Sequence, residues 1–128
     1  MRMDQINVGP IEGLVQLLWD QAGTDIHIAA GAPPMFRIDG DLYPAQGYPV
    51  LLDADVEQLA ETMLTPALRD QFMERHQVDF SFSWKDITRF RGNVFRQRGS
   101  VSMALRSIPY QIPTMADLLL PPVMGEFC

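Results

Sequence analysis

The sequence is almost free of cysteine: the only one among 128 residues is Cys128, at the last position. An intrachain disulfide and a thiolate metal cluster are therefore excluded, which fits a reducing cytosolic setting. Long apolar runs are also missing. No stretch approaches the roughly 18 apolar residues of a membrane span, and residues 1–7 lack the apolar segment of a signal peptide. We therefore expect a protein that is neither exported nor embedded in a membrane.

Lysine is equally scarce, since Lys85 is the only one. It follows Trp84, so the motif Gly-x-x-x-x-Gly-Lys-Ser/Thr, whose backbone amides and lysine bind nucleotide phosphates, does not occur. The chain also offers no Ser-His-Asp or Cys-His set beyond single residues, and most of its carboxylates fall on predicted helix surfaces or caps. We expect this chain to have no catalytic residues of its own and to be inactive alone.

Most of the basic residues are concentrated in one segment. Residues 85–106 contain six basic residues and one acidic residue, a net charge of +5. The other four basic and 15 acidic residues give −11, so the whole chain carries −6. An acidic protein of this kind does not bind nucleic acid in bulk, whereas a local basic strip is compatible with one or a few phosphates.

The length and the apolar content of 47% are those of one ordinary globular domain. Spacings of three and four predict helices, and alternation predicts strands. The segments, in chain order, are a helix over 10–20, strands over 24–29, 34–38 and 41–43, two helices within 51–75, of which the second starts at Pro66, a strand over 78–84 and an Arg-rich hairpin over 89–106. Asp53 and Thr65 are the predicted helix caps. This order predicts an α+β domain, with a mainly antiparallel sheet and helices packed on one side.

The Arg-rich hairpin is the most informative segment. If Arg98 and Gly99 form a two-residue turn, position i faces position 197 − i, and Arg91 lies directly opposite Arg106. This register places Phe90, Gly92 and Val94 on an apolar face and the two arginines on a polar face. Because like charges that face each other across a ladder are destabilising, we expect an anion to belong between them.

A second polar pair lies on the first predicted strand. Asp25 and His27 are two residues apart and share one strand face. Two ligands without a third nearby are weak evidence for a metal site. The favoured reading is therefore a structural one, in which His27 ties down the Gly-Ala-Pro-Pro turn that follows.

The composition changes after Arg106. Spaced prolines, a short predicted helix over 115–120 and the pair at 121–122 read as a linker that leaves the domain. We therefore expect a domain over residues 1–107 and a linker over 108–128.

These segments resemble the N-terminal domain of the type IV pilus retraction ATPases, the PilT-like branch of the type II and type IV secretion ATPases. The matching stretches are TDIHI at 24–28, GAPPMFRIDGDL at 31–42, DFSF at 79–82, RFRGNVFRQRG at 89–99, LRSIP at 105–109 and IPT at 112–114. They cover nearly the whole chain and keep their order, which makes the resemblance specific. Gly92 replaces a usual valine and, as a glycine inside a strand, is compatible with a β-bulge.

The resemblance implies a PAS-like regulatory and oligomerisation domain whose linker leads to a RecA-like ATPase domain absent from this chain. It further implies a cytoplasmic homohexamer, peripheral to the inner membrane, that hydrolyses ATP with Mg to power pilus retraction and twitching motility. The implied partners are this ATPase domain, neighbouring subunits and a pilus or secretion platform protein. By matching motif, Arg91 and Arg106 would contact the ATP phosphates at the domain interface, as arginine fingers do. The isolated fragment is expected to hold no cofactor or metal.

Several alternatives stay open at this level. The same domain occurs in pilus-assembly and type II secretion ATPases, and the sequence does not separate these branches. A free-standing PAS-like sensor of a small ligand is another reading. A single-stranded nucleic-acid platform would need Phe90 and Phe95 to stack on bases, which the predicted burial of Phe90 opposes.

Overall fold

The structure, a computed structural model, describes residues 6–109. Within this range an antiparallel sheet of six strands is accompanied by three α-helices and one short 3₁₀ turn. The elements are η1 (Gly9–Ile11), α1 (Glu12–Asp20), β1 (Asp25–Ala29), β2 (Met35–Ile38), β3 (Asp41–Pro44), α2 (Asp53–Met63), α3 (Pro66–Arg75), β4 (Gln77–Trp84), β5 (Thr88–Gln97) and β6 (Ser100–Pro109). The α+β prediction is confirmed.

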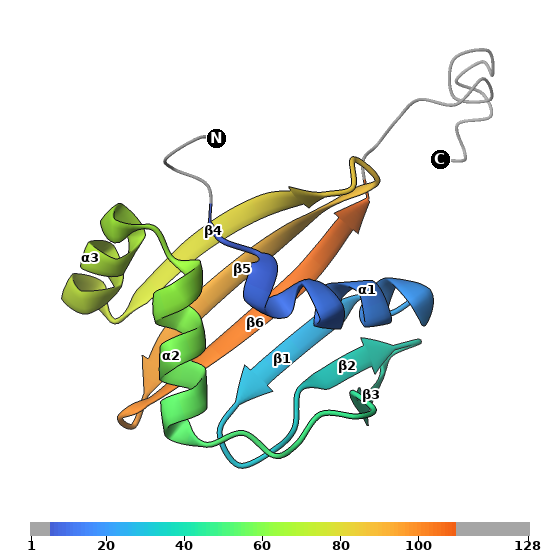
Figure 1. The fold of residues 1–128 in the computed structure, drawn as a ribbon, viewed down its shortest axis with the longest axis horizontal. Coiled ribbons are helices and arrows are strands. Elements are labelled where there is room, and N and C mark those ends of the chain that lie inside the picture. Colours follow the sequence, from blue (N-terminus) through green and yellow to red (C-terminus); the bar gives the residue numbers. More distant parts are fainter. Residues whose placement is uncertain (1–5, 110–128) are drawn as a thin grey trace, which may run out of the picture.

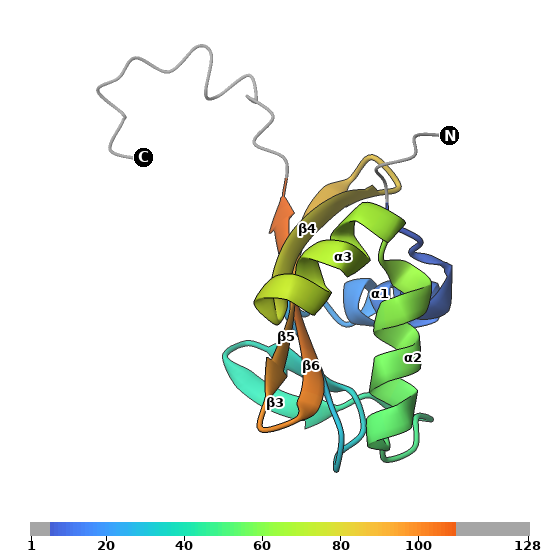
Figure 2. The same ribbon diagram turned by 90° about the vertical axis from the view of Figure 1, so that its left-hand side faces the viewer.

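The sheet has two halves, β1–β3 and β4–β6, in which strands that follow each other in the sequence are paired, and a long-range pairing joins the halves. Its order is β3-β2-β1-β6-β5-β4, so β1 and β6, which are far apart in the sequence, are neighbours at its centre. Figure 1 shows α1 and α2 lying across the strands, with α3 beside the β4 edge. The perpendicular view in Figure 2 shows α1 and α2 on one side of the sheet, with α3 in front of the β4 edge. The opposite side, which we call the open face, carries no helix from the described part of the chain.

The helices form where the apolar spacing predicts them. In α1 the buried Leu14, Val15 and Leu18 follow one stripe, which packs on the sheet. In α3 the side chain of Thr65 accepts a hydrogen bond from the backbone N–H of Leu68 at 3.2 Å, which confirms the predicted cap.

The predicted cap of α2 is wrong. The residue at the N-cap is Leu52, and Asp53 is already the first helical residue. The carboxylate of Asp55 instead accepts a hydrogen bond from the backbone N–H of Leu52 at 2.9 Å. The carboxylate of Asp53 accepts one from the hydroxyl of Ser100 at 2.9 Å and thereby ties α2 to the start of β6. The Asp53 side chain, which local spacing predicts to cap the helix, therefore makes a tertiary contact instead.

Gly92 does not mark a β-bulge. The pairing of β5 with both neighbours runs without interruption, with Gly92 opposite Phe80 on one side and Leu105 on the other. A Cβ at this position would collide with the ring of Phe80 and with the side chain of Leu105. The glycine therefore serves packing, because the aromatic ring fills the space that a side chain would occupy.

The predicted C-terminal linker lies largely beyond this structure. Residues 108 and 109 complete β6, while residues 110–128, with the helix predicted over 115–120, lie outside the described residues. None of the helices between residues 6 and 109 has the length and apolar character needed to cross a membrane.

Candidate phosphate-binding site on the open face

The β5–β6 hairpin has the register that the sequence predicts. Gln97 pairs with Ser100, and Arg91 lies directly opposite Arg106. The turn residues Arg98 and Gly99 have φ of 55° and 85°, the pair of positive values that a two-residue type I′ turn requires. Because directly paired residues point to the same face, both arginines belong to the open face.

One serine and four charged side chains form a row across this face. Cα partners place Ser81, Arg91, Arg106, Asp25 and Arg37 side by side on β4, β5, β6, β1 and β2. Part of this row lines a depression with a volume of about 580 Å³. The lining residues are Asp25, His27, Asp79, Arg91, Gly92, Asn93, Ala104, Leu105, Arg106 and Ile108. The structure thus brings the two predicted site residues into one concave surface.

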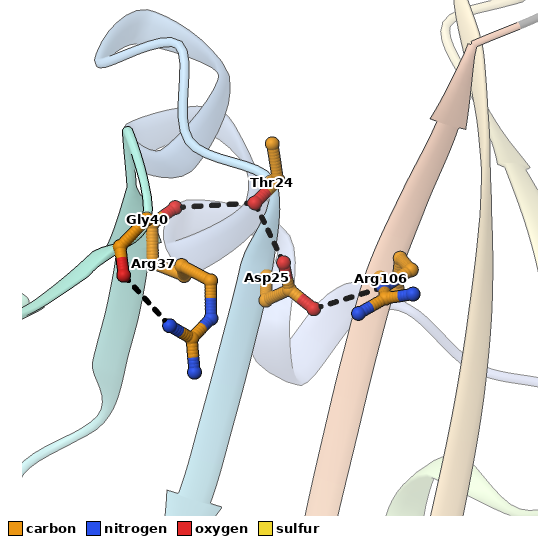
Figure 3. Close-up of polar contacts among 5 residues, drawn as sticks. All are labelled: Thr24, Asp25, Arg37, Gly40 and Arg106. Carbon is orange, nitrogen blue, oxygen red and sulfur yellow. Dashed lines mark hydrogen bonds and ion pairs between the residues drawn. The ribbon is translucent and has the colours of Figure 1, made fainter.

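Arg106 has a carboxylate partner that the sequence did not reveal. Its Nε donates a hydrogen bond to Oδ2 of Asp25 at 3.1 Å, an ion pair whose side chains are 71% and 9% exposed, respectively. The other carboxylate oxygen of Asp25 accepts a hydrogen bond from the hydroxyl of Thr24 at 2.6 Å. Figure 3 shows Asp25 between Arg37 on β2 and Arg106 on β6. Asp25 lies on the other side of Arg106 from Arg91, so it compensates part of the charge of Arg106 but does not occupy the position between the two arginines where the sequence predicts an anion.

The environment of Asp25 favours its ionised form. Burial raises the pKa of this carboxyl, but the hydrogen bonds from Thr24 and Arg106, together with the positive charge of Arg106, lower it more. The resulting pKa lies below the ordinary value for aspartate. Asp25 is therefore a carboxylate at neutral pH and a permanent acceptor for Arg106.

The other two arginines of the row are held differently. Arg91 is exposed and makes no hydrogen bond or ion pair with any residue between 6 and 109. The Nη1 of Arg37 donates to the carbonyl of Gly40 at 2.9 Å, within its own β-hairpin (Figure 3). Arg91 is thus the arginine of this row whose charge is least compensated by the described residues.

His27 does not have the structural role proposed from the sequence. The turn after β1 is held by backbone hydrogen bonds from Gly31 to Leu51 at 2.8 Å and from Leu51 to Ala32 at 3.0 Å. The Nε2 of His27 is buried and has no hydrogen-bond partner in the described part of the chain. That part also contains no group of three or more His, Cys, Asp or Glu residues arranged to hold a metal.

The helix-covered face of the β5–β6 hairpin contains Phe90, one of the two rings that a single-stranded nucleic-acid platform would need. Phe90 is fully buried and stacks on Phe82, with ring centroids 5.2 Å apart. A buried ring is not available to stack on a base. The predicted burial of Phe90 is confirmed.

Comparison with known proteins adds an independent line of evidence. The chain is 36% identical over 118 residues, 90% of its length, to the type IV pilus ATPase PilU of Pseudomonas aeruginosa. It is also 36% identical over 98 residues, 77% of its length, to the type IV pilus retraction ATPase PilT of the same organism. A crystal structure of the pilus retraction motor PilT with bound ADP superimposes with a TM-score of 0.74 and 38% identity over 88% of this chain. No protein-family model matches the sequence.

The chain is homologous to the type IV pilus ATPases PilT and PilU. The fold matches the N-terminal region of PilT. The chain spans only 30% of the curated PilU, 28% of the curated PilT and 33% of the crystallised PilT chain. The family predicted from the motifs is confirmed for a segment of about one third of these ATPases.

The sequence of this PilT-like domain predicts that Arg91 and Arg106 face each other, which the register confirms, but it did not indicate Asp25 as the partner of Arg106. Hairpin register is a local property, so the facing of Arg91 and Arg106 could be read from the alternation. The contact between Asp25 and Arg106 joins residues 81 positions apart and depends on the pairing of β1 with β6. The available signal was that Asp25 occupies the polar side of a strand whose other side holds Ile26 and Ile28.

Proposed function

We propose that this chain is the N-terminal domain of a PilT-like ATPase that powers type IV pilus retraction, and that Arg91 and Arg106 contact the phosphates of a nucleotide bound by a following ATPase domain. The observation that carries the proposal is the pair of arginines facing each other in an open depression. The homology to PilT and PilU supports the pilus assignment.

The electrostatics of the depression support an anionic ligand. Two guanidinium groups from adjacent strands share one surface, and only Arg106 has a carboxylate partner among the described residues. Guanidinium groups remain charged at all physiological pH values and bind phosphate oxygens through paired donors. A phosphate between them would relieve the repulsion across the ladder.

The position of the pair in the chain supports a ligand shared with a second domain. Arg106 lies three residues before Pro109, where β6 ends and the chain continues towards residue 128. A domain that follows this segment would be connected through the strand that carries Arg106. In the proposed assembly, a cytoplasmic hexamer that uses ATP and Mg, the arginines would link the nucleotide state of the ATPase domain to the orientation of this domain.

The proposal is tested on the longer protein of which this chain would be the N-terminal part. Arg91→Ala and Arg106→Ala should each lower the rate of ATP turnover about 10- to 100-fold, because each removes a charged hydrogen bond of about 1.5–3 kcal/mol. The matched control is Arg89→Ala, on the same strand and face but outside the depression, where the side chain contacts Ser81 at 3.3 Å. Turnover near the wild-type rate in both site variants, with folding intact, would refute the assignment.

A further inference from the structure

The contact between Arg106 and Asp25 uses one corner of the guanidinium group. A guanidinium has five N–H donors arranged as a rigid fork. In Arg106 the Nε–H donates to Asp25 at 3.1 Å, and neither Nη atom makes a hydrogen bond to the described residues. The Arg106 side chain is 71% exposed. Its two terminal nitrogens are therefore free to bind an external group while Nε stays occupied.

The carboxylate that holds Nε is itself fixed. Asp25 is buried, and the hydroxyl of Thr24 donates to its second oxygen at 2.6 Å. Its backbone belongs to β1, which is paired with β2 on one side and β6 on the other. Asp25 thus has neither the freedom of an exposed side chain nor that of an edge strand, and its carboxylate points towards Arg106 (Figure 3).

We propose that Asp25 is a positioning residue, which holds Arg106 by Nε so that both terminal nitrogens face the phosphate group; this inference rests on the proposed function. A carboxylate that masked Arg106 would be expected to occupy the terminal nitrogens, the paired donors that also grip phosphate. The contact on Nε leaves those donors open. It also draws the guanidinium towards β1, away from the like charge of Arg91 on β5.

The proposal predicts that loss of the Asp25 carboxylate weakens phosphate binding, which is opposite to the effect expected from its negative charge alone. Removing a negative charge beside an anion site should strengthen anion binding by electrostatics alone. Loss of positioning should instead weaken it, because a long side chain must then be ordered when the ligand binds. The ordering of one such side chain corresponds to a loss of about twofold to tenfold in affinity.

The test uses the 128-residue chain and inorganic tripolyphosphate as the probe. Affinity is measured by calorimetry for the wild type, Asp25→Asn, Asp25→Ala and the control Glu57→Gln. Glu57 pairs with Arg96 at 3.5 Å, lies outside the depression, and its substitution makes the same change in net charge as Asp25→Asn. We expect affinity to fall from wild type to Asp25→Asn to Asp25→Ala and to remain unchanged in Glu57→Gln.

A second measurement observes positioning directly, without ligand. The Nε–Hε NMR signal of Arg106 should show a restricted side chain in the wild type and a mobile one in Asp25→Ala. The Arg106→Ala background removes the group through which Asp25 would act, so there Asp25→Asn should not weaken tripolyphosphate binding. A purely structural role of Asp25 would weaken binding in both backgrounds.

The outcomes separate this inference from the proposed function. If tripolyphosphate binds equally well to the wild type, Arg91→Ala and Arg106→Ala, the phosphate role of the arginines fails. If it binds to none of them, the depression does not bind phosphate by itself and the positioning inference is overturned, while the phosphate role of the arginines is decided by ATP turnover in the longer protein. If these variants bind weakly while folded Asp25→Ala binds as tightly as the wild type or more tightly, only the positioning role is overturned. An Arg106 Nε signal as mobile in the wild type as in Asp25→Ala would overturn it independently.

Discussion

The two faces of strands β5 and β6 differ in burial and in the role that we assign to them. On the helix-covered face Phe90, Val94 and Leu105 are at most 1% exposed, whereas on the open face the Arg106 side chain is 71% exposed. Because side chains alternate, neighbours such as Phe90 and Arg91 experience opposite environments. The comparison teaches that folding and ligand chemistry are assigned here to alternate positions of the same strands, so the two should separate cleanly on mutation.

The largest expected effect is on the covered face. Phe90→Ala should lower the free energy of unfolding by about 3–5 kcal/mol, because it removes a fully buried ring that stacks on Phe82. The neighbouring Arg91→Ala should change it by less than about 0.5 kcal/mol. Urea unfolding followed by circular dichroism measures both. Comparable losses in the two variants would mean that the faces are not independent.

The next effect concerns Gly92, a position of β5 without a side chain on the covered face. Gly92→Val should cost about 1–3 kcal/mol, because the new Cβ meets the ring of Phe80 and the side chain of Leu105. Combining it with Phe80→Leu should recover part of the loss by making room. Thermal unfolding of the single and double variants checks this. A Gly92→Val protein as stable as the wild type would show that the Phe80 ring moves aside freely.

The local features of both faces could be predicted from the sequence. Alternation in residues 78–84 and 89–106 predicts three strands, their inward residues and the facing of Arg91 and Arg106, all of which are confirmed. These features depend on local periodicity and on one short turn, so a single segment determines them.

The parts that the sequence did not give depend on contacts between distant segments. The partner of Arg106 comes from β1, and the carboxylate of Asp53 contacts Ser100 instead of capping α2. Gly92 is explained only by the ring of Phe80 on the neighbouring strand. In each case a local rule suggested a role for the residue, but tertiary packing decided which atom it contacts.

A smaller effect distinguishes the two arginines of the open face. Arg106→Ala should cost about 1 kcal/mol of stability, because it leaves the buried carboxylate of Asp25 with Thr24 as its remaining side-chain partner. Arg91→Ala should have almost no effect, since Arg91 has no ion-pair partner within residues 6–109. Both variants should nevertheless weaken phosphate binding. Equal stability of the two, measured by urea unfolding, would contradict the structural asymmetry between them.

The smallest effect is the pH dependence that Asp25 gives to the open face. Its pKa is lower in the folded protein than the value of about 3.9 in an unfolded chain. The folded state therefore binds fewer protons, and the stabilisation that Asp25 contributes is complete above that value and is lost as the pH falls through the folded pKa. The difference in unfolding free energy between the wild type and Asp25→Asn should be constant from pH 7 to about pH 5 and shrink below about pH 4. In an Arg106→Ala background the same difference should be smaller, because the charge and hydrogen bond that help to lower the pKa of Asp25 are gone. Urea unfolding across this pH range measures both series, and a difference that persists unchanged at pH 2 would mean that the carboxylate of Asp25 does not interact with Arg106 in solution.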